Sequence, residues 1–372
     1  MPTVVFAPDS FKGTLDAASA ARALADGWLS ARPEDAVVLR PMADGGEGTL
    51  AAFATVPGAI RMPVTVRGPD DRDVDAAWLL LPPTPAFPRG TGVVELASTS
   101  GIELLDELRP DAAHTIGFGQ AIAAALDHGV SRLVLGIGSS ASTDAGLGML
   151  TALGARARDA AGAPLGGGLR DLAALAALDL TALRPLPPTL VVTDVTNPLL
   201  GPRGAAHVFG PQKGLDAHGI ARADTALHGY AARFPDADPA TPGAGAAGGV
   251  GFTLHALGAR LGSGAAEVAD LVGLDAALAG ADAVVTGEGA YDRQSADGKV
   301  PAFVAAAASA RRVPALLAAG RIAPDAELGA FAGAVSLVEL AGSADAATAD
   351  PARWLRAAGA HLAAHPDVAG IR

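Results

Sequence analysis

The sequence predicts a two-domain α/β protein in which both ends of the chain build one doubly wound parallel sheet. Three observations predict this fold class. Short apolar strands alternate with alanine-rich helices near both ends of the chain. The middle of the chain carries strands of its own. The chain also has 372 residues, more than one ordinary hydrophobic core accommodates. We therefore expect one discontinuous domain from residues 1–64 and 276–372, and an inserted mixed α/β domain over residues 65–275.

The N-terminal part of the chain reads strand, helix, strand. The run Thr3–Ala7 is apolar and partly β-branched, which predicts a strand. Leu15–Ala31 has the apolar spacing of a helix, with Thr14 as a candidate N-cap. Val37–Leu39 predicts a second strand, and the glycine-rich loop MADGGEGT follows it.

The C-terminal part repeats this alternation. The segment ADAVVTGEG predicts a strand that runs into a glycine loop, and Lys299–Arg311 predicts an alanine-rich helix. PALLAAG and GAVSLVEL predict two more strands, and Pro351–Ala364 predicts a last helix. The inserted domain has strands of its own at RDVDAAWLLL, TGVVELAS, SRLVLGIG and TLVVTDV.

The strand order decides where a ligand would bind. In a doubly wound sheet, ligands lie beyond the C-terminal strand ends, at the point where the strand order reverses. A flavodoxin-like order places that point between the first strand and the third. The loops Asp9–Gly13 and Gly287–Asp292 would then meet there. This order therefore predicts that Lys12 and Glu288 share one crevice.

Composition excludes several classes of protein. The net charge of −12 argues against a surface that binds nucleic acid, which needs many cations. No stretch approaches the ~18–20 apolar residues of a membrane span, and no signal peptide precedes the first strand. The absence of cysteine excludes disulfides and thiolate sites, and the histidines show no zinc-binding spacing. These features predict a cytoplasmic enzyme with no nucleic-acid or membrane partner.

The lysines are few and similarly placed. The chain has only three, Lys12, Lys213 and Lys299, and each lies beside a glycine. A base composition that favours arginine codons explains why lysine is rare. It does not explain why all three remaining lysines fall in glycine-flanked loops. A lysine is a compact point charge on a thin stem, so these positions suit a crowded anion pocket.

A serine-rich loop, Gly136–Gly146, follows one strand of the inserted domain and precedes a helix. Hydroxyls and exposed amides before a helix N-terminus predict an anion cradle. The alternative is a turn in which Thr143 or Asp144 caps the helix. The letters GIGSSA also fit the dinucleotide fingerprint, a weak signal by itself. That fingerprint keeps a nicotinamide-dependent oxidoreductase open as a rival function.

Further polar residues follow the other strands. Asp194 ends a strand, where a carboxylate serves as a general base or a magnesium ligand; the alternative is an Asx-turn before Pro198. Lys213 falls on a tight turn and is either functional or simply solvated. Glu288 and Asp292 are candidates for magnesium, with helix capping as the alternative.

Known catalytic motifs narrow the chemistry. The chain has no Walker A motif, no kinase catalytic loop and no G-x-S-x-G nucleophile elbow. Glycine loops, hydroxyls, lysines and carboxylates at strand ends suit phosphoryl transfer, in which positioning and charge neutralisation dominate. A non-catalytic sensor of a small hydroxy acid is a further rival, because it needs an anion pocket but no nucleotide site.

Taken together, the motifs resemble those of the type-1 bacterial glycerate kinases, which form 2-phosphoglycerate. The matching stretches keep the family's order over nearly the whole chain. They are APDSFKGT, PMADGGEGT, VVELASTSGIELL, LGIGSSASTDAGLGMLTALGA, TDVTNPLLGPRGAAHVFGPQKG, GAGAAGGVGF and VVTGEGAYDRQSADGKVP. The chain departs from the family pattern at Ser139, Thr143 and Ala145, and at Tyr291, where the family usually has leucine.

The resemblance implies ATP-dependent phosphorylation of D-glycerate at its 2-hydroxyl, giving 2-phospho-D-glycerate and ADP, with Mg²⁺ as cofactor. It also implies a flavodoxin-like domain formed by both chain ends and an inserted mixed α/β domain. The expected partners are D-glycerate and the nucleotide. The oligomeric state stays open, with a homodimer among the alternatives.

The resemblance also implies roles for individual residues. Asp194 and Lys12 are the candidate catalytic residues: Asp194 would orient and deprotonate the 2-hydroxyl, and Lys12 would pair with the glycerate carboxylate or the transferring phosphoryl group. Glu288 and Asp292 are the candidate magnesium ligands. The candidates for substrate and phosphate binding are Asp9, Ser10, Ser139, Ser140, Ser142, Asn197 and Lys213.

Overall fold

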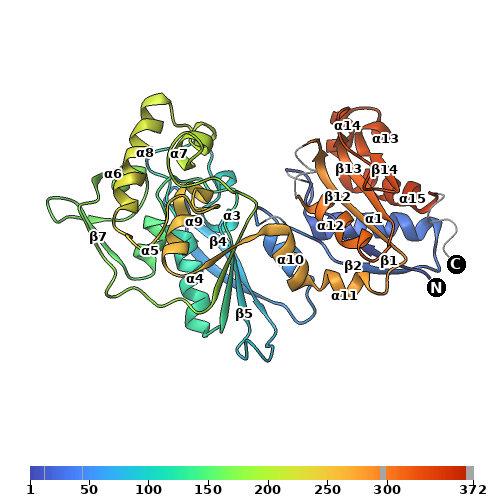
Figure 1. Ribbon diagram of the computed structural model, residues 1–372, viewed down its shortest axis with the longest axis horizontal. Helices are drawn as coiled ribbons and strands as arrows, with labels where there is room; N and C mark the ends of the chain where they lie inside the picture. The colour runs from blue at the N-terminus through green and yellow to red at the C-terminus, as the bar shows by residue number, and fades with distance from the viewer. Residues whose placement is uncertain (12, 44, 294–298, 366–372) are drawn as a thin grey trace. The chain divides into compact units, whose positions relative to one another are not determined.

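The computed structural model describes residues 1–11, 13–43, 45–293 and 299–365. The chain divides into two compact units. The first unit consists of Met1–Asp44, Ala51–Val56 and Gly264–Arg372, and the second of Gly45–Leu50 and Pro57–Ser263. The predicted domain boundaries, with residues 1–64 and 276–372 in one domain and 65–275 in the other, stay a prediction. Figure 1 shows that segments from the two chain ends, drawn blue and red, belong to the same unit.

A five-stranded parallel sheet forms the centre of the first unit. Its order is β2-β1-β12-β13-β14, and every neighbouring pair is parallel. The strands are β1 (Thr3–Phe6), β2 (Ala36–Leu39), β12 (Ala283–Tyr291), β13 (Ala315–Ile322) and β14 (Gly333–Ser336). Counted within the unit, this is the order 2-1-3-4-5 of flavodoxin-like sheets, which confirms the predicted fold class.

Helices cover this sheet on both faces, because right-handed crossovers on either side of β1 place them so. α1 (Ala17–Ala31) and α15 (Pro351–Ala363) pack together, whereas α12 (Val300–Ser309) packs on β12 and β13. α1 and α15 approach closely because side chains on Gly27 and Gly359 would collide with backbone carbonyls of the opposite helix. The remaining helices are α10 (Gly264–Val272), α11 (Leu274–Leu278), α13 (Leu337–Ala341), α14 (Ala344–Ala349) and α2 (Thr49–Phe53), which continues from the second unit.

Two local predictions in the first unit are wrong. α1 begins at Ala17, and Asp16 caps it by accepting a hydrogen bond from Ser19 N. Thr14 instead donates its hydroxyl to Phe11 O at 2.7 Å. The segment GAVSLVEL is a strand only in its first half, because α13 begins at Leu337.

The second unit is built on a six-stranded mixed sheet with the order β11-β10-β6-β5-β4-β3. Its strands are β3 (Ile60–Arg67), β4 (Asp73–Leu81), β5 (Thr91–Glu95), β6 (Arg132–Gly136), β10 (Thr189–Thr193) and β11 (Arg260–Ser263). β3, β4 and β5 pair antiparallel, and the other pairs are parallel. The predicted inserted mixed α/β unit is therefore present. A small antiparallel sheet adds β7 (Arg156–Arg158), β8 (Pro164–Leu165) and β9 (Ala177–Asp179).

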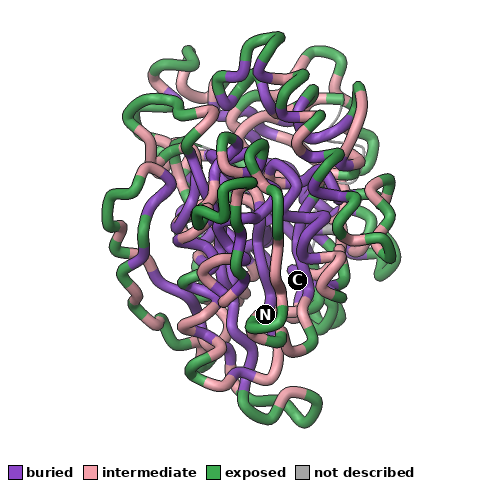
Figure 2. The backbone as a smooth tube through the Cα atoms, turned by 90° about the vertical axis from the view of Figure 1, so that its left-hand side faces the viewer, coloured by how far each residue is buried: buried purple, intermediate pink, exposed green. Residues whose placement is uncertain are grey.

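Helices pack around these strands and enclose one large apolar core. They are α3 (Ala97–Ser100), α4 (Ile116–His128), α5 (Leu147–Ala152), α6 (Leu169–Ala174), α7 (Ala205–Phe209), α8 (Ala217–Ala231) and α9 (Ala246–Ala256), with 3₁₀ turns at Ile102–Leu104 and Pro211–Lys213. Figure 2 shows that buried positions run through the interior of the molecule and that exposed positions gather on its outer loops. Within the described ranges, no helix combines the length and the apolar character of a membrane span.

Candidate functional site

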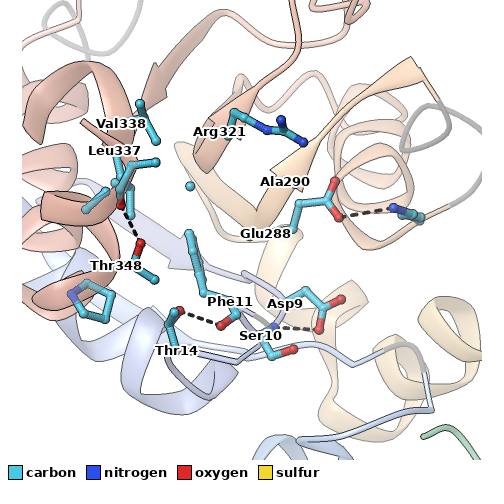
Figure 3. Close-up of a pocket in the computed structure, with 16 residues that line it drawn as sticks. Asp9, Ser10, Phe11, Thr14, Glu288, Ala290, Arg321, Leu337, Val338 and Thr348 are labelled. Atoms are coloured by element: carbon cyan, nitrogen blue, oxygen red, sulfur yellow. Dashed lines mark hydrogen bonds and ion pairs between the residues drawn. The ribbon is translucent and has the colours of Figure 1, made fainter. Parts of the chain in front are cut away.

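A cavity of about 500 Å³ lies in the first unit, where the strand order reverses. The segment after β1 and the C-terminal parts of β12 and β13 contribute to its wall, and α13 and α14 supply further residues. Figure 3 shows the side chains around it, with Phe11 between an apolar group on one side and charged groups on the other. The lining residues include Asp9, Ser10, Phe11, Thr14, Glu288, Lys299, Arg321, Leu337, Val338, Ala344, Ala347 and Thr348.

The polar part of this cavity joins the two loops that the sequence predicted to meet. Asp9 N donates to Gly287 O at 2.8 Å, which fixes the segment after β1 against β12. Asp9 and Glu288 are both buried carboxylates and both line the cavity. Lys299 lies 3.8 Å from Glu288 Oε2 and forms an ion pair with it. The predicted meeting of the loops is thus present, whereas Lys12 lies outside the described residues.

Ser10 is buried at the cavity, and its hydroxyl has no hydrogen-bond partner among the described residues. Its backbone N–H donates to Asp9 Oδ1 at 2.7 Å. The residue is 6% exposed, and its hydroxyl finds no hydrogen-bond partner within the described parts of the chain. A buried hydroxyl without a partner is unfavourable unless a ligand or water supplies one. This hydroxyl is therefore available to a molecule in the cavity.

Two further residues that the sequence analysis named, Tyr291 and Asp292, lie at the end of β12 and directly after it. Tyr291 is buried, donates its hydroxyl to Glu327 O at 3.2 Å, and packs its ring edge-on against Phe331. The tyrosine that stands where the family usually has leucine therefore belongs to an apolar cluster with Phe331. Asp292 follows β12 but is not among the residues that line the cavity. Its role as a magnesium ligand stays a prediction.

The residues of the cavity suit magnesium that arrives with a nucleotide. Mg²⁺ is usually held by one or two carboxylates together with substrate phosphates and water. Among the described residues, no group of three or more acidic, histidine or cysteine side chains forms a metal site. Glu288 and Asp9 are two carboxylates at one end of the cavity. They suit a magnesium ion whose remaining ligands are phosphate oxygens and water.

The serine-rich loop of the second unit is closed around its own polar groups. Asp144 is fully buried and accepts hydrogen bonds on both carboxylate oxygens. Oδ1 accepts from Ser142 Oγ and Gly146 N, while Oδ2 accepts from Gly148 N and from the amide and hydroxyl of Thr115. Asp144 thus binds the amides of Gly146 and Gly148 at the start of α5, although Gly146 itself is the N-cap, and it also fixes the loop to the start of α4.

Lys213 lies beneath the same loop. Its ammonium group donates to Ser142 O at 2.5 Å and lies 3.4 Å from Ser140 Oγ. The residue is 3% exposed, so the interpretation of Lys213 as a solvated turn lysine is wrong. Burial lowers the pKa of Lys213 to about 8, and the nearby Asp144 carboxylate opposes this shift. The structure therefore brings together Lys213, Ser140 and Ser142, three predicted phosphate ligands.

Ser139 differs from these buried serines because it is exposed and has a left-handed backbone with φ 58°. Its carbonyl accepts from Ile102 N at 2.8 Å, which holds the loop in this shape. Strained backbone of this kind persists only where surrounding contacts maintain it, and it often occurs at ligand sites. The role of the three serines as phosphate ligands stays a prediction.

The segment after β10 carries the remaining candidates. Asp194 is exposed and directly follows the strand. Asn197 donates its amide to Arg203 O at 2.8 Å, so its side chain closes the following loop. Val195 N donates to Thr193 Oγ1 at 3.2 Å. The strand end thus presents Asp194 at the surface of the second unit, while its catalytic role stays a prediction.

Glu95, at the end of β5, was not predicted as a special residue. Its side chain is 6% exposed, and its Oε1 accepts from Leu50 N at 3.2 Å. Burial raises the pKa of the Glu95 carboxyl to about 7, although backbone amides at residues 48–50 lower it. The only signal in the sequence was a carboxylate directly after the apolar run TGVV.

The fingerprint GIGSSA does not open a dinucleotide-binding unit in the described part of the chain. Such a unit needs a second strand parallel to the first in the same sheet. The next strand after α5 is β7, which pairs antiparallel with β8 and β9 in a separate sheet. Asp159, about where the ribose-binding acid would stand, accepts hydrogen bonds from Ala161 N and Ala163 N within a turn.

Comparisons with known proteins agree with this architecture. A model of the glycerate kinase family matches residues 4–365. The chain belongs to the glycerate kinase family. A glycerate 2-kinase of Escherichia coli K12 is 38% identical, covering 87% of this chain and 86% of that protein. A glycerate kinase of Bacillus subtilis 168 is 39% identical with the same coverage.

A solved structure has a fold similar to that of this chain. It belongs to a protein of Salmonella typhimurium LT2 that is described as a candidate glycerate kinase 2. The two chains superpose with a TM-score of 0.82 at 36% identity, covering 98% of this chain and 97% of the other. The likeness thus extends over both units of the chain.

Proposed function

We propose that this protein phosphorylates D-glycerate at its 2-hydroxyl with ATP, giving 2-phospho-D-glycerate and ADP. Membership of the glycerate kinase family over nearly the whole chain is the observation that carries this proposal. The relative from Escherichia coli, a glycerate 2-kinase, supports the 2-position. The polar cavity at the switch point of the first unit adds a site whose cations and carboxylates suit a phosphorylated ligand with its metal ion.

The reaction is a transfer of the γ-phosphoryl group to an alcohol. The 2-hydroxyl oxygen of glycerate forms a bond to the γ-phosphorus, and the bond from that phosphorus to the leaving oxygen of ADP breaks. The hydroxyl proton must go to a base, which we assign to Asp194. We assign Lys12 to the glycerate carboxylate or to the transferring phosphoryl group. Both roles rest on the family motifs in which these residues stand.

Charge neutralisation supplies most of the catalysis in such a transfer. We assign Lys299, beside Glu288 in the cavity, to phosphate charge. Magnesium bound with ATP would neutralise phosphate oxygens. We assign Glu288 and Asp292 to it on the family motif, and Asp9 is a further candidate because it lines the cavity together with Glu288. Ser139, Ser140, Ser142, Asn197 and Lys213 remain the proposed phosphate or substrate residues of the second unit.

Phosphorus NMR of the purified protein with D-glycerate and Mg–ATP tests this proposal. We expect a 2-phosphoglycerate signal that grows as the γ-phosphate signal of ATP declines. A 3-phosphoglycerate signal would keep the kinase and overturn the 2-position. Intact ATP, with thermal stabilisation of the protein by glycerate alone, would favour a sensor of a small hydroxy acid instead.

The proposed base is tested by Asp194→Asn. An asparagine keeps the shape of the side chain but accepts no proton, so kcat should fall by about 10²-fold or more while both KM values change little. Asp159→Asn, in a turn of the same unit, is the matched control and should leave kcat unchanged. Near-normal turnover of Asp194→Asn would remove Asp194 from the mechanism.

A further inference from the structure

We propose that the cavity of the first unit binds the adenine and ribose of the nucleotide, with the base at the apolar end and the phosphates at the polar end. This inference rests on the proposed kinase function and locates one of its two substrates. Figure 3 shows the two ends: Leu337, Val338 and Thr348 lie on one side of Phe11, and Asp9, Ser10 and Glu288 lie on the other.

The size of the cavity favours a nucleotide over glycerate. Its volume of about 500 Å³ falls within the roughly 300–1,000 Å³ of pockets that hold drug-sized ligands. Glycerate is a three-carbon acid and would leave most of this space unfilled. A nucleoside with its phosphates is of the size that such a pocket encloses.

The apolar end has the chemistry of a base-binding slot. Its walls are the aliphatic side chains of Leu337 and Val338, two alanines of α14 and the ring of Phe11. Burying a flat, weakly hydrated base against such walls is favourable, whereas burying a glycerate carboxylate there is not.

Two threonine hydroxyls at this end restrict which groups of a ligand can bind. Thr14 donates to Phe11 O, and Thr348 donates to Ala344 O. Because each hydroxyl proton is used, each oxygen is left as an acceptor. Acceptors suit a ligand that presents N–H groups, and the exocyclic amine of adenine is such a group.

The polar end has the chemistry of a phosphate site. Lys299 precedes the ten-residue helix α12, whose N-terminal amides and dipole favour an anion. Arg321 adds a second cation, and the Ser10 hydroxyl, which has no hydrogen-bond partner among the described residues, can donate to a phosphate or ribose oxygen. Asp9 and Glu288 stand at the same end, so phosphate binds there only together with these cations and the metal of Mg–ATP.

Ala344→Leu tests the location of the base. Ala344 lines the cavity from the exposed first turn of α14, so a leucine there fills space without overpacking the core. We expect the Kd for ADP, measured by calorimetry on the full chain, to rise at least about tenfold. The KM for ATP should rise similarly, and the KM for glycerate should stay within about twofold.

Ala349→Leu is the matched control, because Ala349 is exposed on the same helix and does not line the cavity. It should bind ADP as the wild type does. A second measurement maps the base directly. Photolabelling the full chain with 8-azido-ATP should mark peptides that contain Phe11 or Leu337–Pro351. Labelling confined to peptides of the second unit, or an unchanged Kd for ADP in Ala344→Leu, would overturn the inference.

These measurements separate the inference from the proposed function. If the wild type binds ADP and Ala344→Leu does not, but no phosphoglycerate forms, the nucleotide site stands and the choice of glycerate is wrong. If phosphoglycerate forms and Ala344→Leu keeps its affinity for ADP, the function stands and this location is wrong. If the wild type binds no ADP, both are wrong.

Discussion

The loop after β1 in the first unit and the loop after β6 in the second unit use similar residues in opposite ways. Both follow a central parallel strand, and both contain serine, aspartate and glycine near a strand end. Around the first loop the structure leaves a cavity, and the hydroxyl of Ser10 has no partner among the described residues. In the second, Ser142, Asp144 and Lys213 are buried against one another.

Polar residues at strand ends therefore serve either to fix a loop or to bind a ligand. A buried group whose hydrogen bonds are completed within the protein fixes the shape of its loop. A buried group left without a partner is available to a ligand. By this criterion, Asp144 fixes the shape of the serine-rich loop, and Lys213 supports that loop in addition to its proposed role toward phosphate. The same criterion predicts that Ser10 belongs to a binding surface. The predictions below test that division, in order of decreasing expected effect.

Asp144→Asn should destabilise the protein most. Both oxygens of Asp144 accept backbone N–H groups, so an asparagine amide would face an N–H donor in either orientation. We expect a loss of about 3–5 kcal/mol in the free energy of unfolding, the range for breaking a buried charged network. Urea denaturation measures it. Asp159→Asn is the control, because Ala161 N and Ala163 N both donate to Oδ1 of Asp159 and the amide oxygen of an asparagine can accept both bonds. If Asp144→Asn lost as little unfolding free energy as Asp159→Asn, the structural role of Asp144 would be refuted.

The alternation of strands and helices in the sequence was enough to predict the sheet of the first unit and the meeting of its two loops. Those features follow from chain order and the handedness of crossovers. The burial of Lys213 could not be predicted, because its partners Ser140 and Ser142 lie more than 70 residues away. A turn sequence does not tell which way a lysine points. Similarly, the apolar run GAVSLVEL has no period that separates a strand from the short helix that follows it.

Glu95, at the end of β5, is a further buried polar residue at a strand end of the second unit. Its folded pKa of about 7 lies above the ordinary pKa of 4.5 for a glutamate, so the folded protein holds a proton that the unfolded chain has released between these pH values. Stability therefore falls as pH rises through that window, by about 2 kcal/mol between pH 5.5 and 8. Glu95→Gln should lack this decline. Urea midpoints at the two pH values test it, and equal slopes in both proteins would contradict the buried, protonated acid.

Lys213 should make the free energy of unfolding rise with pH, opposite to Glu95 and at higher pH. Its folded pKa of about 8 lies below the ordinary pKa of 10.5 for a lysine, so between these pH values the unfolded chain holds a proton that the folded protein has released. Stability contributed by this group therefore rises with pH, by about 2 kcal/mol between pH 7.5 and 9.5. Lys213→Met should lose that rise, while Lys299→Met should keep it because Lys299 is partly exposed at the cavity. Identical pH profiles for Lys213→Met and the wild type would show that Lys213 is solvated.

Serine-to-alanine substitutions compare the two loops most directly, because the chemical change is the same. Ser142→Ala removes a hydroxyl that donates to the buried Asp144 carboxylate, so it should lower the free energy of unfolding by about 1.5 kcal/mol. Ser10→Ala removes a buried hydroxyl without a described partner, so stability in the absence of ligand should change by less than about 0.5 kcal/mol. Ser10→Ala should instead weaken ADP binding, by about threefold, since the nucleotide would lose a donor. Urea denaturation without ligand and calorimetry with ADP distinguish the two effects. If Ser10→Ala destabilised the ligand-free protein as much as Ser142→Ala, the loop after β1 would be as self-contained as the serine-rich loop.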